Sequence, residues 1–125
     1  MNTDEEKLNQ ITEAIIGHAY TVSNALGCGF LEKVYENSLV HLLRKAGVKV
    51  AQQVEMDVHF DGVIVGHYVA DIVVEDVVLV ELKAAKALDG SHTAQCLNYL
   101  KATRKPLCLL INFGQPKVEV KRLRL

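Results

Sequence analysis

Apolar residues recur every three or four positions along the first third of the chain, which is the spacing of one face of an α-helix. A first stripe of apolar residues runs over positions 8–26 and ends at Gly27, and a second runs over positions 30–46 and ends at Gly47. Glycine directly after the last periodic residue is a common helix stop. The pattern therefore predicts two amphipathic helices joined by a short glycine turn.

Beyond Gly47 the apolar period changes to two, which is typical of β-strands. Positions 54–60 alternate between apolar and polar side chains, which predicts a strand with one wet face, and the following Asp61-Gly62 pair is a hairpin turn signal. Positions 63–74 are mostly apolar and predict a strand buried on both faces. Positions 77–83 predict a third strand, which continues the meander.

Positions 91–102 return to the helical period, and Ser91 is the predicted N-cap of this third helix. The Lys105-Pro106 step ends the helix, because proline disfavours helical backbone in the residue before it. Positions 107–113 and 118–123 predict the last two strands. The order is two helices, three strands, one helix and two strands, which predicts an α/β fold with a mixed β-sheet flanked by helices.

Length and composition fit one domain over residues 1–125, because 50% of the 125 residues are hydrophobic. The net charge is only −1, with 14 Lys and Arg against 15 Asp and Glu, but the two signs are unevenly distributed. Residues 1–76 carry 5 basic and 12 acidic side chains, whereas residues 77–125 carry 9 basic and 3 acidic ones. An acidic half followed by a basic half can place a cation site beside an anion site.

Cellular location is expected to be cytoplasmic. The start of the chain is polar and acidic, so no signal peptide is expected, and no apolar run approaches the ~20 residues of a membrane span. Cys28, Cys96 and Cys108 are an odd number of widely spaced cysteines without a CxxC pair. This pattern favours free thiols in a reducing compartment.

Three charged residues interrupt the most apolar segments of the chain. Asp71 lies within the second predicted strand, and Glu81 and Lys83 lie at the end of the third. Burying a charge is costly unless the group is paired or binds a metal, so these positions are the best candidates for chemistry. Glu81 and Lys83 are two residues apart on a strand and therefore project from the same face.

The position of Asp71 relative to Glu81 depends on the register of the hairpin between the two strands. If Val74 lies opposite Val78, Asp71 lies opposite Glu81. A tight two-residue turn would instead pair Asp71 with Val80 and turn Glu81 to the other face. The chemical interpretation requires the first register or a bulge.

Two carboxylates and a lysine on one sheet face suit phosphodiester hydrolysis. The carboxylates can hold a hard divalent cation, Mg²⁺ or Mn²⁺, which neutralises phosphate charge and activates water. The lysine can orient the water or stabilise charge that develops on the phosphate. The alternative is an ordinary ion pair between Glu81 and Lys83 on the wet face of an edge strand, which leaves Asp71 unexplained.

Three motifs together resemble a known group of nucleases. Asp71 followed by Glu81-x-Lys83 resembles the PD-(D/E)xK nuclease motif. Gly29-x-x-Glu32-x-x-Tyr35 is similar to the G-x-x-E-x-x-Y signature of a family of small bacterial proteins in that superfamily. Gln95-x-x-x-Tyr99 is similar to the Q-x-x-x-Y motif of RecB-like nucleases, and the resemblance covers residues 15–125.

The resemblance implies a restriction-endonuclease-like core and a role for each matching residue. Metal ligands are implied at Glu32, Asp71, Glu81 and the backbone carbonyl of Leu82. Catalytic roles are implied for Lys83, Glu81, Asp71 and Gln95, and substrate contacts for Tyr99. His92 lies on the same helical face as Gln95, and it and Lys86 are further candidates for a phosphate contact. Val69 stands where many family members carry an arginine, which removes one possible phosphate contact.

Plainer interpretations exist for several of these residues. Tyr35 and Tyr99 are more often packing residues with a bonded hydroxyl than catalytic groups. A zinc site at His92 and Cys96 lacks a third and a fourth ligand. The basic residues late in the chain fit either a solvated face or a surface for a polyanion, and they are Lys86, Lys101, Arg104, Lys105, Lys117, Lys121, Arg122 and Arg124.

The sequence therefore predicts a metal-dependent nuclease, with DNA favoured over RNA as the substrate and a homodimer as a further expectation. The alternative from a different class is a catalytically silent module that binds nucleic acid or protein and keeps the nuclease fold. Divalent-metal binding separates the two, because a silent module does not need the metal site.

Overall fold

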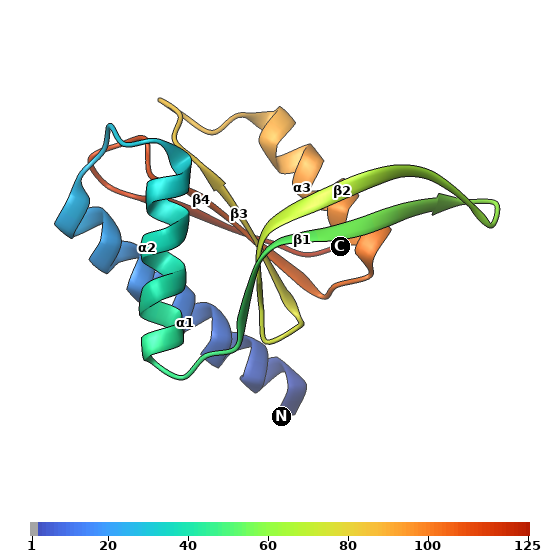
Figure 1. Ribbon diagram of the computed structural model, residues 1–125, viewed down its shortest axis with the longest axis horizontal. Coiled ribbons are helices and arrows are strands. Elements are labelled where there is room, and N and C mark those ends of the chain that lie inside the picture. The colour runs from blue at the N-terminus through green and yellow to red at the C-terminus, as the bar shows by residue number, and fades with distance from the viewer. Residues whose placement is uncertain (1–2) are drawn as a thin grey trace.

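The computed structural model describes residues 3–125 as helices and strands in the predicted order (Figure 1). The helices are α1 (Thr3–Leu26), α2 (Glu32–Lys45) and α3 (Gly90–Thr103). The strands are β1 (Val50–Phe60), β2 (Val63–Val74), β3 (Val78–Lys83), β4 (Leu107–Asn112) and β5 (Glu119–Leu123). Within the described residues, no helix combines the length and the apolar character that crossing a membrane requires.

The five strands form one mixed sheet in the order β1-β2-β3-β4-β5. β1, β2 and β3 form the predicted antiparallel meander, β3 and β4 are parallel, and β5 pairs antiparallel with β4. A parallel pair needs a crossover connection, and α3 supplies it between β3 and β4. The prediction of an α/β fold with a mixed sheet flanked by helices is confirmed.

The two faces of the sheet carry separate hydrophobic clusters. Val80 and Leu82 of β3 pack on the cluster that includes α1 and α2, whereas Leu79 packs on the cluster that includes α3. β3 and β4 are therefore buried on both faces, as their continuous apolar sequences require. The end of β3, which carries Glu81 and Lys83, lies between the two helical layers.

β2 differs from its prediction, because only its last three residues, 72–74, are buried on both faces. Val63, Ile64 and Val65 are 60%, 50% and 59% exposed, whereas Ile72 and Val74 are fully buried. The pairing of β2 with β3 stops at Ile72, and beyond that point β1 and β2 continue without a third strand as a projecting hairpin, whose base packs on α3 (Figure 1). We call residues 54–70 the hairpin arm. An apolar run shows that a strand can be buried, but here the sheet and helices end before the run does.

The start of α3 also differs from its prediction, because Asp89 rather than Ser91 is the N-cap. The Asp89 carboxylate accepts hydrogen bonds from the backbone N–H groups of Ser91 and His92, at 2.8 Å and 3.3 Å. His92 Nδ1 in turn accepts from the backbone N–H of Asp89 at 3.2 Å. A carboxylate two residues upstream of the serine satisfies two free N–H groups of the helix, so α3 begins at Gly90.

Candidate active site

The register between β2 and β3 brings Asp71 and Glu81 together. Val74 pairs with Val78, which is the first of the two registers considered from the sequence. The ladder ends one residue before Asp71 and Glu81, so the strands begin to separate at the two acids. The Asp71 carboxylate fills the gap by accepting a hydrogen bond from the backbone N–H of Leu82 at 2.9 Å.

Glu81 is a buried acid with a raised pKa. Its side chain is buried, with 7% exposure, and the Tyr68 hydroxyl donates a hydrogen bond to it. Burial, and then the negative charge of Asp71, raise the pKa of Glu81 from its usual 4.5 to about 7. The hydrogen bond from Tyr68 and the positive charge of Lys83 act in the opposite direction. Lys83 is therefore close enough to affect Glu81, as their spacing predicted.

Asp71 and Glu81 fit a hard divalent cation. Among residues 3–125, neither carboxylate forms an ion pair with lysine or arginine, so their like charges are not neutralised by a direct protein partner. Two adjacent carboxylates are oxygen ligands of the kind that Mg²⁺ prefers, and Mg²⁺ usually keeps several waters. In the same described residues, no three His, Cys, Asp or Glu side chains are grouped closely enough to form a metal site by themselves.

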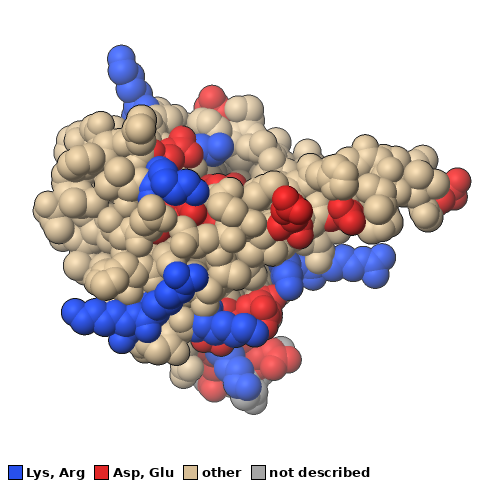
Figure 2. Space-filling view, in the orientation of Figure 1, with Lys and Arg blue, Asp and Glu red and all other residues tan. Residues whose placement is uncertain are grey.

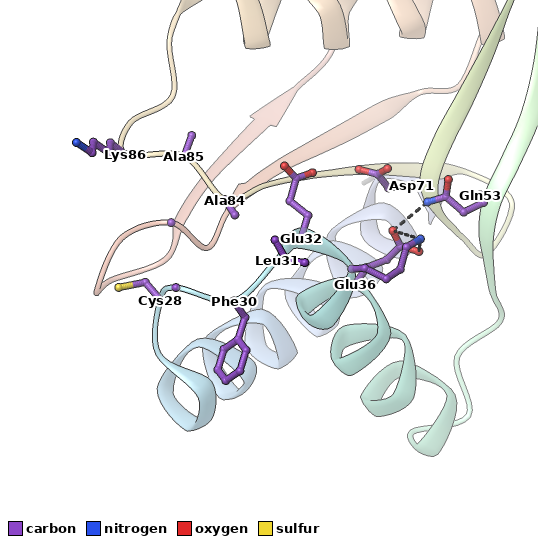
Figure 3. Close-up of a pocket in the computed structure, with 13 residues that line it drawn as sticks. Cys28, Phe30, Leu31, Glu32, Glu36, Gln53, Asp71, Ala84, Ala85 and Lys86 are labelled. Atoms are coloured by element: carbon purple, nitrogen blue, oxygen red, sulfur yellow. Dashed lines mark hydrogen bonds and ion pairs between the residues drawn. The ribbon is translucent and has the colours of Figure 1, made fainter.

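A cleft of about 850 Å³ opens beside the acids (Figure 3). Glu32, at the first position of α2, and Asp71 both point into this cleft, and Lys86 lies at its rim. Glu81 and Lys83 do not line it, because they lie on the sheet face that carries α3. Asp71 therefore links the cleft to the buried Glu81. Lys33 also lines the cleft and is not among the predicted site residues.

The turn before α2 is held by Tyr35. Its hydroxyl donates to the carbonyl of Gly27 at 2.6 Å and accepts from the backbone N–H of Phe30 at 3.2 Å. Its buried ring stacks on Phe113 with 4.6 Å between centroids. Gly29 has a φ of +113°, which glycine adopts without strain. The structural interpretation of Tyr35 is confirmed, and the turn it holds places the following helix start at the cleft.

The segment after Lys83 is fixed by Asn112, a buried residue that is not among the predicted site residues. Its side chain accepts from the backbone N–H of Ala85 at 2.9 Å and donates to the carbonyl of Ala85 at 2.9 Å. Gly114 lies so close that a Cβ there would be 2.1 Å from the Ala85 carbonyl oxygen, so only glycine fits. These contacts hold the segment that carries Lys86 beside the cleft. A single amide inside an apolar strand is the signal that points to Asn112.

The family model described as the PD-(D/E)XK nuclease superfamily matches residues 9–123. The chain belongs to the PD-(D/E)XK nuclease superfamily. Neither the comparison with curated proteins nor that with solved structures found a match. Nucleases of this superfamily generally depend on a divalent metal, which agrees with the unneutralised acids at Asp71 and Glu81.

The face of α3 that carries Gln95 and Tyr99 reaches the acids through stacked rings. The Gln95 amide donates to the Tyr99 hydroxyl at 2.5 Å, and the Tyr99 ring stacks on Tyr68 with 3.4 Å between centroids. The Tyr68 hydroxyl donates a hydrogen bond to the Glu81 carboxylate, and Tyr68 is not among the predicted site residues. Gln95 is exposed and its amide is hydrogen-bonded to the Tyr99 hydroxyl, so its own hydrogen bond does not reach the carboxylates.

The remaining candidate residues of this PD-(D/E)XK domain differ in how far partners within the chain already engage them. His92 Nδ1 is occupied by the helix cap, so only Nε2 is left for the expected phosphate contact. Arg122 and Arg124 form ion pairs with Glu5 of α1, at 3.6 Å and 2.7 Å, and are thus partly engaged within the chain. Cys28, Cys96 and Cys108 are free cysteines. Glu36, a buried acid one turn after Glu32, lines the cleft and is also not among the predicted residues.

Proposed function

We propose that this chain is a metal-dependent nuclease that hydrolyses phosphodiester bonds of DNA, and that it belongs to the G-x-x-E-x-x-Y branch of the superfamily. The observation that carries the proposal is the pair of Asp71 and Glu81, side by side where two strands separate, with Lys83 close to Glu81. The superfamily match supports a nuclease-type function independently.

The residues divide the chemistry among them. Asp71, Glu81 and the carbonyl of Leu82 would hold Mg²⁺ or Mn²⁺, and Glu32, which lines the cleft together with Asp71, is proposed as a further ligand from α2. The bound metal supplies charge neutralisation at the phosphate and lowers the pKa of water. The Lys83 ammonium orients the attacking water or stabilises the charge on the phosphate.

Substrate contacts are proposed around the metal residues. Lys86 at the rim of the cleft contacts a phosphate, and Tyr99, held by Gln95, guides the strand on the α3 side together with His92. Within the described residues, one five-stranded sheet and three helices leave little room for a module that reads base sequence, so the proposed cutting by this domain is structure-selective or nonspecific. The free cysteines support a reducing, cytoplasmic setting.

A cleavage assay tests the proposed function. Single-stranded, duplex and flapped DNA, and RNA, are incubated with the protein in Mg²⁺, Mn²⁺ or EDTA, in parallel with Lys83→Ala purified identically. We expect cutting of DNA that needs the metal and that is lost in the variant. If wild type and variant behave alike, any cutting is a contaminant and the silent binding module is the better interpretation.

We also infer that two copies associate through the hairpin arm. Phe60, Ile64 and Val65 on the arm are 73%, 50% and 59% exposed, and residues 50–74 contain no lysine or arginine. In Figure 2 the arm is tan with red acidic side chains, which disfavours contact with phosphates. A groove of about 400 Å³ between α1 and α2 has mainly apolar walls, with Arg44 and Lys45 nearby on α2. The apolar side chains on the arm of a second copy match the apolar walls of this groove, and its acidic side chains match the basic residues nearby.

Phe60→Asp is expected to convert the dimer to a monomer, because it places a charge at the exposed apolar tip of the arm. Light scattering after size-exclusion chromatography at several protein concentrations measures the change. Leu125→Asp is the matched control, since Leu125 is 72% exposed and lies outside the arm, against 73% for Phe60. A wild-type protein that is monomeric at every concentration contradicts the inference.

A further inference from the structure

A buried acid beside the cleft is held by two neighbouring glutamines. Glu36 is 4% exposed, and its carboxylate accepts hydrogen bonds from Gln52 Nε2 at 2.7 Å and from Gln53 Nε2 at 2.9 Å. Lys33 Nζ lies 3.1 Å from the same carboxylate. We call Glu36, Gln52 and Gln53 the Glu36 clamp. It joins α2 to β1 next to the proposed metal site (Figure 3).

The clamp requires an unusual backbone at Gln53. Adjacent residues on a strand normally point to opposite faces, so two consecutive glutamines should not reach one carboxylate. Gln53 has a φ of +50°, in the left-handed region that non-glycine residues rarely adopt, and this turns both amides toward α2. The same residue shifts the strand, because Val50 packs on the α1 and α2 side whereas Val54 packs on the α3 side.

The strained residue lies next to the metal acids. β1 pairs Gln52 with Ile72 and Val54 with Ala70, so Gln53 stands opposite Asp71. Glu36 is one helical turn after Glu32, and residues four apart share a helix face. The clamp therefore connects the strand position facing Asp71 to the helix that carries Glu32. Backbone strain and a buried charge both cost stability, and such costs concentrate where the geometry of a site must be held.

We propose that Glu36 and Gln53 are positioning residues, which set the place of Glu32 relative to Asp71 and thereby the affinity for the divalent metal. This inference rests on the proposed metal-dependent function. Neither residue contacts substrate or metal in this role. They act by fixing the start of α2 against β1, because within residues 3–125 neither Glu32 nor Asp71 has a side-chain bond that joins the helix to the strand directly.

Two conservative variants test the proposal. Gln53→Asn keeps a residue that tolerates a positive φ but shortens the side chain by one methylene, so the amide no longer reaches Glu36. Glu36→Gln keeps the volume and removes the charge. Gln10→Asn, an exposed position on α1, is the matched control. Calorimetry with Mn²⁺ gives the dissociation constant, thermal unfolding in EDTA gives the stability, and cleavage rates over a range of Mn²⁺ concentrations give the dependence on metal.

We expect both variants to weaken Mn²⁺ binding by roughly 10-fold to 100-fold, the range seen when partners that orient metal ligands are removed. Cleavage should recover substantially at saturating Mn²⁺, because Asp71, Glu81 and Lys83 are intact. The control should match wild type. Mn²⁺ dissociation constants within twofold of wild type in both variants, whatever the change in unfolding temperature, would show that the clamp is only structural and overturn the proposal. A wild-type protein that binds no Mn²⁺ overturns the proposed metal site itself, and the inference with it.

Discussion

Asp71→Asn is expected to abolish metal binding and metal-dependent cleavage while the fold is kept. Asparagine has nearly the same size and keeps one carbonyl oxygen that can accept the hydrogen bond from Leu82 N–H, which is 2.9 Å long in wild type. It lacks the negative charge and one of the two carboxylate oxygens that the cation needs. We expect Mn²⁺ affinity to fall by at least about 100-fold, because loss of a direct ligand costs more than the 10-fold to 100-fold lost with its partners.

The measurement combines calorimetry with Mn²⁺, the cleavage assay and thermal unfolding in EDTA. Asp61→Asn is the matched control, since Asp61 has a φ of +53° in the turn of the hairpin arm and asparagine is also favoured there. The control should bind metal and cut as wild type does. If Asp71→Asn binds Mn²⁺ like wild type, Asp71 is not a ligand, and the meeting of the two acids has another explanation.

Much of the fold was predictable, because its strongest signals are local. The helical stripes ending at Gly27 and Gly47 correspond to α1 and α2, and the continuous apolar runs correspond to β3 and β4. Errors occurred where a local signal depended on its surroundings. The apolar start of β2 extends beyond the helices that would have covered it, and Asp89 provides a cap two residues before Ser91.

The candidate site was predictable only in part. Asp71, Glu81 and Lys83 stand out in the sequence because each places a charge in an apolar segment, but their meeting depended on a register that the sequence left open. Tyr68 and Gln53 carry no such signal. The role of Tyr68 depends on the stack with Tyr99, and that of Gln53 on a positive φ, and both arise only when distant segments pack together.

Glu81→Gln is expected to raise the stability of the fold at pH 8 and to lower cleavage, and the pKa of Glu81 is the reason for the first effect. In the folded chain this pKa is about 7, against 4.5 for an ordinary glutamate, so the folded state binds the proton more tightly than the unfolded state does. The resulting stabilisation is fully present below pH 4.5 and is lost as the pH rises through 7. At pH 8 the charged carboxylate is buried beside Asp71, and only Lys83 and the Tyr68 hydroxyl offset the cost.

Glu81→Gln removes this titration but keeps an oxygen that can accept the hydrogen bond from Tyr68. In EDTA at pH 8 we expect the variant to be more stable than wild type by about 1 to 3 kcal/mol, and the difference to vanish near pH 4.5. Cleavage should fall at least about 100-fold, because a direct metal ligand is lost. Urea unfolding from pH 4.5 to 8, together with the cleavage assay, measures both effects.

Adding Mn²⁺ at pH 8 should reverse the order of stability, because the metal binds the folded wild type and not the variant, and a ligand that binds only the folded state stabilises it. We expect wild type to be less stable than Glu81→Gln without metal and more stable with it. This reversal would show that the buried carboxylate binds the cation. If Mn²⁺ leaves both unfolding curves unchanged, the buried Glu81 carboxylate lowers the stability of the fold without binding a metal, and the metal site is excluded.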